Sequence, residues 1–392
     1  MERDTGSYDP AREAPESVAG RLPMGNWPVS PNDWREAARQ VLAPGPWGYL
    51  EGGAGGEETL RANREAFRRW VLRPRVLRGV ADRDLSVQIL GRRVPVPFLL
   101  APVGIQEVAH ADAELASARA AAARGIPFIA STFGSVPMEQ LAAAIGDAPR
   151  WFQLYAGKSQ EISASLVARA QEAGFEALVV TVDTVLLGWR ERDLGQSFVP
   201  FTGGRGMANH LSDPAFRGML RRPPEEDLDA AMRAFDALFA NPSLAWSDLA
   251  AIRRQWRGPL WIKGVTHPDD ARAAADHGVD GVIVSTHGGR QVDGAIAALD
   301  ALPAVVEAVG DRMPVLMDSG IRRGADVLKA AALGARAVLL GRLYQYGLAV
   351  GGEAGVGRVL DNLTADVDVT LALCGRRRMA DVDRTLVTPS AQ

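Results

Sequence analysis

Short, continuous apolar runs alternate with Ala-rich segments from about Pro95 onward. Each run has five to seven residues and no polar alternation, which is typical of strands covered on both faces. There are eight such runs: Pro97–Ala101, Pro127–Ser131, Arg150–Tyr155, Ala177–Asp183, Pro259–Lys263, Asp280–Ser285, Pro314–Asp318 and Ala337–Gly341. The segments between them have the Ala, Leu and charge pattern of helices, including Asp112–Arg124, Ile162–Ala173, Pro268–His277, Leu299–Val309 and Gly324–Leu333.

The chain thus has eight predicted strands, each followed by a predicted helix, over about 250 residues. This number and order match a (β/α)8 TIM barrel. A doubly wound open sheet is the competing α/β architecture, and the strand count favours the barrel. The sequence therefore predicts one α/β barrel domain over residues 31–392, with an N-terminal helical extension.

The N-terminal residues 1–30 are rich in Gly, Pro, Ser and charge without a period, which predicts a loose arm that could pack on a neighbouring subunit. Regular structure should begin near Asp33, whose carboxylate could cap a helix running to about Leu42. The small residues of Glu51–Glu57 predict a loop.

One connection is far longer than the rest. About 75 residues separate Asp183 from Pro259, and they include Gly203–Gly206, Pro214 and Pro223-Pro224. A long excursion at the catalytic end of a barrel is usually a lid, so we expect a lid insert after the fourth strand, over about residues 187–256. A disordered insert is the alternative.

Composition narrows the class of protein. The 392 residues carry a net charge of −3, which gives no reason to expect a nucleic acid or an anionic membrane as partner. The one cysteine, Cys374, cannot form an intrachain disulfide, and the His and acidic residues show no metal-ligand spacing. The polar segment Met1–Pro10 lacks the apolar core of a secretory signal, and no apolar stretch could span a membrane. We expect a cytoplasmic protein without a metal site.

The ends of the apolar runs are polar or small, at the positions where barrel enzymes collect functional groups. Any one of these residues could be a satisfied structural polar group, but all eight ends share the feature. The residues are Pro102-Val103-Gly104, Ser131-Thr132, Gln153 with Tyr155, Thr181 with Asp183, Lys263, Ser285 with His287 and Arg290, Asp318 with Gly320 and Arg322, and Gly341-Arg342.

The last two strand ends predict a phosphate site, because glycines expose backbone N–H groups and arginines add charged donors. These segments are Asp318–Gly324 and Gly341-Arg342, and ordinary turns with surface arginines are the alternative. A loop resembling the end of a P-loop, Gly157-Lys158-Ser159, lacks the rest of that motif, and no strand is followed by a dinucleotide fingerprint.

A catalytic base can be sought among the five histidines. His287 directly follows the sixth apolar run, with two glycines and Arg290 behind it, and is the strongest candidate. Asp183 could hold its imidazole in one tautomer. The other four have simpler explanations at helix ends or in loops: His110, His210, His267 and His277.

At these residues the chain resembles the FMN-dependent L-2-hydroxy acid oxidase and dehydrogenase family, over about residues 33–375. The matching segments are Tyr49–Ala54, Trp151–Tyr155, Thr181–Asp183, Ile262–Val265, His287–Gln291 and Asp318–Arg322. Within the family the chain is most similar to the lactate 2-monooxygenases, through Leu22–Met24, Gly188–Arg190, Arg192–Leu194, Ser212–Phe216 and Asp318–Gly320. A plain 2-hydroxy acid oxidase is the alternative.

The resemblance implies a role for each matching residue. His287 would be the base, Asp183 its partner, and Tyr155 a hydrogen-bond partner of the substrate oxygen. Tyr49, Arg190 and Arg290 would bind the substrate carboxylate, for which arginine supplies a planar two-pronged donor. Lys263 would stabilise the reduced flavin as a fixed cation. The remaining FMN contacts implied are Pro102, Val103, Gly104, Ser131, Gln153 and Thr181 at the ring, and Ser285, Asp318, Ser319, Gly320, Arg322, Gly341 and Arg342 at the ribityl phosphate.

Several positions depart from the family pattern. Thr286 replaces the usual Asn before the histidine, Leu343 replaces a Pro after Gly341-Arg342, and Tyr155 is followed by Ala-Gly-Lys-Ser. None of these changes removes a catalytic group. Phe133, Gly104, Ile105 and the insert would line the substrate pocket.

The resemblance implies that an L-2-hydroxy acid, lactate-like, is oxidised with O2 as acceptor and that the keto acid is decarboxylated in the closed site. The alternatives are an oxidase or dehydrogenase that releases the 2-keto acid, with a bulkier substrate such as mandelate, and a barrel that only binds a phosphorylated ligand. A homo-oligomer, tetramer or octamer, is also implied.

Overall fold

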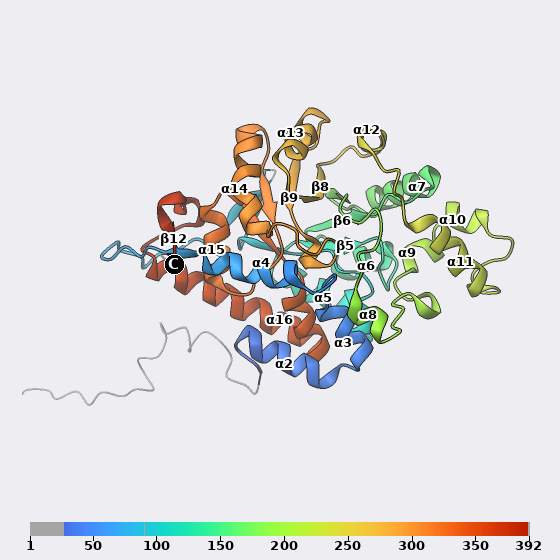
Figure 1. Ribbon diagram of the computed structural model, residues 1–392, viewed down its shortest axis with the longest axis horizontal. Helices are drawn as coiled ribbons and strands as arrows, with labels where there is room; N and C mark the ends of the chain where they lie inside the picture. Colours follow the sequence, from blue (N-terminus) through green and yellow to red (C-terminus); the bar gives the residue numbers. More distant parts are fainter. Residues whose placement is uncertain (1–26, 90, 391–392) are drawn as a thin grey trace, which may run out of the picture.

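Eight parallel strands form a closed barrel in the computed structural model, which describes residues 27–89 and 91–390 (Figure 1). The barrel closes where the last strand pairs with the first, with Val338 opposite Phe98. This closure confirms the TIM barrel and excludes the open sheet. The strands are β4 (Phe98–Leu100), β5 (Phe128–Ser131), β6 (Arg150–Leu154), β7 (Ala177–Thr181), β8 (Leu260–Val265), β9 (Gly281–Val284), β10 (Val315–Met317) and β11 (Ala337–Leu340).

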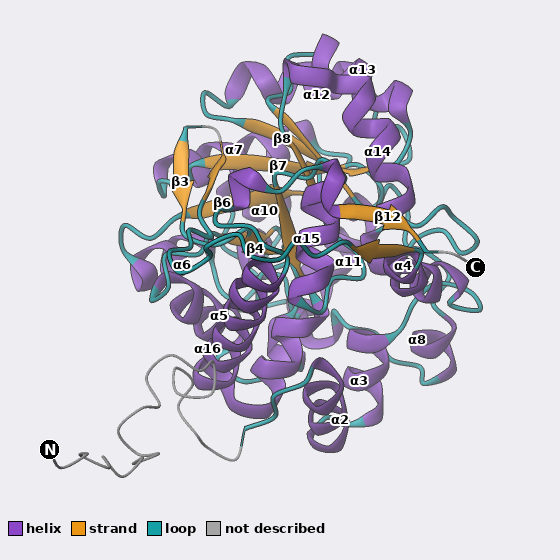
Figure 2. Cartoon of the chain, turned by 90° about the vertical axis from the view of Figure 1, so that its left-hand side faces the viewer, coloured by secondary structure: helices purple, strands orange, loops and turns teal. Residues whose placement is uncertain are grey.

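Every strand of the barrel matches one of the predicted apolar runs, and a helix follows each of them around the outside (Figure 2). The five predicted helical segments are confirmed, and α6, α12 and α16 complete the ring. The helices are α5 (Ala113–Ala122), α6 (Met138–Ile145), α7 (Gln160–Glu172), α12 (Trp246–Gln255), α13 (Pro268–Asp276), α14 (Ala298–Val309), α15 (Gly324–Ala332) and α16 (Arg342–Leu373).

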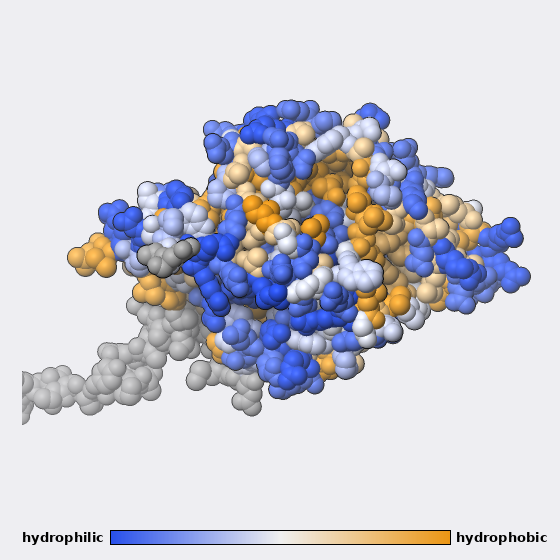
Figure 3. Space-filling model, viewed as in Figure 1, coloured by the Kyte–Doolittle hydropathy of each residue, from blue (hydrophilic) through white to orange (hydrophobic). Residues whose placement is uncertain are grey.

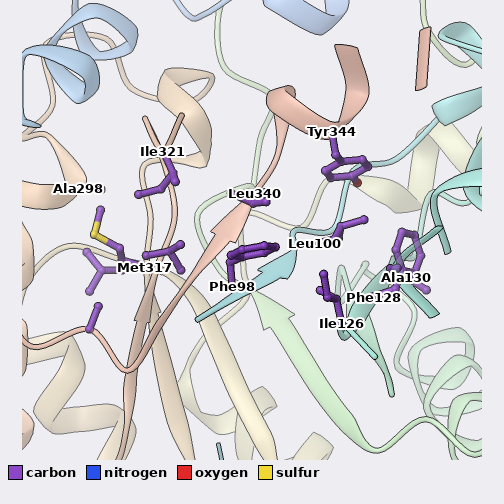
Figure 4. Packing of buried hydrophobic residues seen from close by; sticks show 14 of the residues in the cluster. Phe98, Leu100, Ile126, Phe128, Ala130, Ala298, Met317, Ile321, Leu340 and Tyr344 are labelled. Carbon is purple, nitrogen blue, oxygen red and sulfur yellow. The ribbon is translucent and has the colours of Figure 1, made fainter. Parts of the chain in front are cut away.

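Burial on both faces explains why the strands read as unbroken apolar runs. Side chains such as Leu99 and Ile129 fill the barrel interior, where Trp151 and Trp261 stack at 5.4 Å. Their sequence neighbours, including Phe98 and Leu100, pack outward against the helices (Figure 4). The close-packed interior leaves the strand ends as the place where polar side chains can meet a ligand.

A small antiparallel pair of strands contributes to the inner core. It consists of β2 (Val87–Ile89) and β3 (Arg92–Val94), which supply Ile89 and Val94 to the cluster that fills the barrel. A second antiparallel pair, β1 (Trp70–Leu72) with β12 (Val387–Pro389), joins the segment that precedes the barrel to the C-terminal end of the described chain. The apolar pattern did not indicate either pair, because each of these strands is partly exposed rather than buried throughout.

The N-terminal helical extension consists of α2 (Pro31–Val41), α3 (Pro44–Glu51) and α4 (Glu58–Arg68), and α2 packs against α16. The predicted cap is wrong. Ser30 caps α2, since its hydroxyl accepts a hydrogen bond from the Asp33 backbone N–H at 3.1 Å. Pro31 suits the first position of the helix, so the helix starts before Asp33. Most of the predicted arm, and Leu22–Met24 with it, lies outside the described residues.

The long insert is folded, so the disordered alternative is wrong. It contains α8 (Glu191–Gly195), α9 (Ala208–Leu211), α10 (Pro214–Met219) and α11 (Leu228–Phe239). α12 then packs beside α7 as one of the barrel helices. Among the described residues, no helix is both long and apolar enough to cross a membrane.

Candidate active site

The polar strand ends line one cavity at the C-terminal end of the barrel, with a volume of about 1230 Å³ including its open mouth. Sixteen of the twenty predicted site residues line it: Tyr49, Pro102, Val103, Gly104, Ser131, Tyr155, Arg190, Lys263, His287, Arg290, Asp318, Ser319, Gly320, Arg322, Gly341 and Arg342. The other four are placed directly behind this lining or within the strands: Gln153, Thr181, Asp183 and Ser285.

His287 and Asp183 form a hydrogen-bonded pair, with 2.9 Å between His287 Nδ1 and Asp183 Oδ1. Burial lowers the pKa of His287, and the nearby Asp183 carboxylate offsets only part of that effect. Burial acts to raise the pKa of Asp183, but the charges of His287 and Lys263 keep it below its ordinary value. In the neutral imidazole the proton therefore lies on Nδ1, which faces Asp183, and Nε2 is free to accept a proton.

The backbone of His287 has a left-handed conformation with φ of 55°, and its N–H donates to Ser285 Oγ at 3.0 Å. The Tyr155 hydroxyl lies 3.5 Å from His287 Nε2. Burial, together with the charge of Asp183, raises the pKa of Tyr155, so this phenol keeps its proton. A base and a neutral hydrogen-bond donor therefore face the same point of the cavity.

Two arginines supply positive charge beside this pair. The Arg290 guanidinium lies 4.9 Å from the ring centroid of Tyr49 and donates to the carbonyls of Tyr49 and Gly52. Burial, with repulsion from Arg190, lowers the pKa of Arg290 to about 10, so Arg290 remains charged at neutral pH. Arg190 is held by the Arg290 carbonyl and by the Gln291 side chain. Two fixed guanidinium groups suit a carboxylate ligand.

A buried cation lies on the other side of the base. Lys263 Nζ contacts Asp318 Oδ2 at 2.9 Å and Ser285 Oγ at 2.8 Å. Burial acts to lower the pKa of Lys263, but Asp318 and Asp183 outweigh it and raise the pKa. Ser319 donates to Asp318 Oδ1 at 2.7 Å, which helps to fix the carboxylate. Lys263 can therefore stabilise negative charge that develops on a bound group.

Unpaired polar atoms indicate that this cavity takes a large polar ligand. Gln153 Nε2 and Thr181 Oγ1 are buried and have no hydrogen-bond partner. Buried polar groups are normally paired, so a ligand that carries both donors and acceptors would satisfy them. The flavin ring has such an edge of carbonyl and N–H groups, and these two residues are the ones expected to line it.

The opposite end of the cavity suits a phosphate. Arg322 and Arg342 both line it, and a β-carbon at Gly341 would meet nothing within 4 Å, so the backbone there is open to a ligand. Burial lowers the pKa of Arg342 to about 10, and Arg342 donates to the carbonyls of Leu50, Gly52 and Gly288. The residues present thus fit FMN, and the described residues contain no cluster that could hold a metal ion.

The departures from the family pattern have structural explanations. Thr286 accepts a hydrogen bond from Asn63 at 2.8 Å and contacts Ser319, so it supports the loop behind His287. Lys158 donates to the Ala237 carbonyl and so fixes the end of α11. Leu343 is buried in the first turn of α16.

Three of the remaining histidines lie at or near helix ends: His110 before α5, with His267 and His277 at the two ends of α13. His210 differs, since its ring packs against Phe216 and Phe235 in the insert, and burial lowers its pKa to about 4.

Sequence reasoning missed several residues of the site. Thr184 lines the cavity and contacts the Asp183–His287 pair. The insert lines the cavity as expected, but the residues through which it does so, Leu187, Pro200 and Phe201, were not singled out. Asn209 fixes the insert to the barrel. Thr184 could have been suspected from its position next to Asp183, but the others depend on how the insert folds.

The chain is similar in sequence and in structure to enzymes that oxidise 2-hydroxy acids, and it matches a family of FMN-dependent enzymes. A family model described as FMN-dependent dehydrogenase matches residues 38–389. The chain is 43% identical over 349 residues to an L-lactate oxidase of Lysinibacillus sphaericus, covering 89% of this chain and 90% of that protein. It is 41% identical over 358 residues to human 2-hydroxyacid oxidase 1, covering 91% of this chain and 95% of that protein. A crystal structure of mandelate oxidase with (S)-4-hydroxymandelic acid superposes with a TM-score of 0.83 at 38% identity, covering 93% of this chain and all of that one.

Proposed function

Since the chain belongs to the FMN-dependent dehydrogenase family and is an FMN-dependent 2-hydroxy acid oxidoreductase, we propose three further points about its reaction. The substrate is a lactate-like L-2-hydroxy acid. O2 is the electron acceptor. The resulting 2-keto acid is decarboxylated before it leaves the closed pocket, as in a lactate 2-monooxygenase.

The residues that line the cavity have different roles in the proposed oxidation. Arg290, Tyr49 and Arg190 bind the substrate carboxylate and so direct the 2-hydroxy group at His287. His287 Nε2 takes one proton from the substrate, and Asp183 stabilises the imidazolium that results. The Tyr155 hydroxyl donates a hydrogen bond to the substrate oxygen. FMN, when bound, would supply the acceptor for the two electrons, and O2 would be the final oxidant.

The proposed reaction balances in two steps. The 2-hydroxy acid and O2 give the 2-keto acid and H2O2, so the substrate loses two electrons and two protons. Peroxide then attacks the keto carbon, the bond between C1 and C2 breaks, and the products are a carboxylic acid shorter by one carbon, CO2 and water. The second step requires that keto acid and peroxide stay together.

The observation that carries this proposal is the contact between the insert and the cavity wall. Phe201 of the insert packs edge-on against Phe133, with ring centroids 5.2 Å apart, and both line the cavity. Pro200 and Leu187 add to the same apolar wall. An apolar wall of this kind suits a short apolar side chain and shields that side of the cavity from bulk water.

A buried amide fastens the insert in this position. Asn209 is 1% exposed, and its Nδ2 donates to the carbonyls of Ser131 and Thr132, both at 3.1 Å. Its Oδ1 accepts from the Met138 N–H at 2.8 Å. Because all three partners belong to the barrel, this part of the insert is held in a fixed position relative to the barrel.

Product analysis tests the proposal. With L-lactate and O2, we expect acetate and CO2 with little free peroxide. Phe201→Ala opens the wall and should shift the products toward pyruvate and peroxide. Val199→Ala is the matched control, because Val199 lies two residues away and is 60% exposed. Pyruvate and stoichiometric peroxide from the unmodified protein would contradict the decarboxylation.

A plain oxidase that releases the keto acid is the second candidate. The similarity to proteins named L-lactate oxidase and 2-hydroxyacid oxidase 1 favours it, as does the open mouth of the cavity. The mandelate oxidase structures extend the substrate range to be tested to aryl side chains. L-Mandelate oxidised faster than L-lactate would favour this alternative.

The assembly is a further part of the proposal. Leu186 and Trp189, at the start of the insert, are 56% and 70% exposed, and Figure 3 shows apolar surface on one face of the molecule. Exposed apolar groups of this kind favour a subunit interface, so we propose a homo-oligomer, a tetramer or octamer. Light scattering coupled to gel filtration gives the subunit number, and a monomer would contradict it. The cytoplasmic location remains a prediction.

A further inference from the structure

We infer that Thr184 is a positioning residue for the catalytic base: its hydroxyl holds the Asp183 carboxylate in place, so that the His287 proton stays on Nδ1. Thr184 Oγ1 donates to Asp183 Oδ1 at 2.9 Å and lies 3.2 Å from His287 Nδ1. The residue is 7% exposed and lines the cavity. The inference rests on the role of His287 as base proposed above.

Both hydrogen bonds to the Asp183 carboxylate are made to the same oxygen atom. Asp183 Oδ1 accepts from Thr184 and from His287 Nδ1, whereas Asp183 Oδ2 is buried and has no hydrogen-bond partner. A hydroxyl has one proton to donate, and the proton of Thr184 is used on Oδ1. The Thr184 oxygen therefore presents lone pairs to Nδ1, so both neighbours of Nδ1 are acceptors. This environment fixes the proton on Nδ1 and leaves Nε2 as the basic atom.

Two other contacts help to fix the position of Asp183, but neither donates a hydrogen bond to its carboxylate. Gln291 Nε2 donates to the Asp183 carbonyl at 2.9 Å. Gly264 lies against the side chain, where a β-carbon would come within 2.8 Å of Oδ2. Thr184 alone among these neighbours donates to the carboxylate itself, so it can adjust how strongly Asp183 stabilises the imidazolium.

The other charged and titratable groups around the pair are Lys263 at the end of β8, Arg190 from the insert and Tyr155 at the end of β6. Each affects the pair through its charge or its phenol rather than through a hydrogen bond to Asp183. Removing the Thr184 hydroxyl leaves Lys263 and Arg190 unchanged, and it also removes the contact of Thr184 with the Tyr155 phenol. Oδ1 would then carry more of the negative charge and favour a protonated His287.

Two substitutions separate this role from simple packing. Thr184→Val keeps the shape of the side chain and removes the hydroxyl, whereas Thr184→Ser keeps the hydroxyl and removes a methyl group. For Thr184→Val we expect kcat/KM to fall about tenfold, and the acid limb of its pH profile to move upward by about half a pH unit to one unit. Thr184→Ser should stay close to the original protein in both respects.

FMN content and visible spectrum, measured on each variant, show whether the cavity is intact. If Thr184→Val loses FMN, the nitrogen NMR signals of His287 in the flavin-free protein report the same proton position. An unchanged pH profile and unchanged His287 signals in Thr184→Val would overturn the inference, as would a Thr184→Ser variant equally impaired. Full activity in His287→Asn would instead remove the proposed function on which the inference rests.

Discussion

Asp183 lies so close to Gly264 that a β-carbon at position 264 would come 2.5 Å from the Asp183 β-carbon. Real β-carbons do not approach other heavy atoms so closely, and Gly264 also has a φ of 110°, which disfavours any other residue. The glycine next to Lys263 is therefore required by the position of the carboxylate that orients His287.

Gly264→Ala should displace Asp183 and lower kcat by at least about tenfold, with a stability loss of about 1–3 kcal/mol from backbone strain. Gly278→Ala is the matched control, because Gly278 has a φ of 72° and nothing within 4 Å of its would-be β-carbon. The control should lose stability but not activity. Kinetics and thermal unfolding on both variants check this, and equal activity in the two would show that the contact does not matter.

Arg290→Lys should raise the KM for the 2-hydroxy acid by about 10- to 100-fold, because the change keeps the charge but removes the planar fork that binds a carboxylate. Lysine also cannot reproduce the stacking of the guanidinium on Tyr49. Steady-state kinetics give the result. Arg254→Lys, at an exposed position on α12, is the control and should change nothing. An unchanged KM in Arg290→Lys would place the carboxylate elsewhere.

The activity should be lost on the acid side of neutrality. Burial lowers the pKa of His287, so the imidazole stays neutral below the ordinary histidine value of about 6.5. Since the neutral form is the base, kcat/KM should stay level from about pH 8 down to about pH 6.5 and fall at lower pH. The pH profile of kcat/KM measures this. An acid limb above about pH 7 would mean that His287 is charged in the free enzyme.

The lowered pKa of His287 also makes the stability of the fold depend on pH. An unfolded chain protonates a histidine near pH 6.5, whereas folded His287 resists protonation, so the unfolded state binds more protons as the pH falls. His287 therefore destabilises the fold at pH values below about 6.5 and has no such effect above it. Unfolding measured at two pH values should show a smaller acid-induced loss for His287→Asn than for the unmodified protein.

Asn209→Ala should detach the insert from the barrel. The change leaves the Met138 N–H and the carbonyls of Ser131 and Thr132 without their partner, at a cost of about 2–4 kcal/mol. Denaturant unfolding gives the loss, and proteolysis should become faster within the insert. Asn362→Ala is the control, since within the described part of the chain the Asn362 side chain makes only two long hydrogen bonds, at 3.3 and 3.4 Å. Equal losses in the two variants would contradict the anchoring role.

The sequence was sufficient for the barrel and for the chemical groups, because both leave local patterns. A strand buried on both faces must be continuously apolar, and most of the active groups lie within such a strand or soon after it, as Lys263 in β8 and His287 after β9 do. The interactions between those groups were harder to predict from the sequence. That Asp318 pairs with Lys263 depends on the neighbouring positions of β8, β9 and β10 in the closed sheet.

The insert could not be predicted in the same way. Its contacts join residues distant in the sequence, such as Asn209 with the Ser131 carbonyl, and no local pattern marks an asparagine that will be buried. The helix start at Ser30 was missed for a local reason, since Ser30 and Asp33 are both good caps and Pro31 decided between them.

The most direct test of the account is to mix the FMN-loaded protein with L-lactate in the absence of O2 and follow the visible absorbance of the flavin. We predict rapid bleaching in the unmodified protein, and bleaching slower by about 10²–10⁴-fold in His287→Asn, which keeps the cavity but lacks the base. A flavin that stays oxidised with L-lactate and with L-mandelate, or a variant that bleaches as fast as the original, would contradict the account.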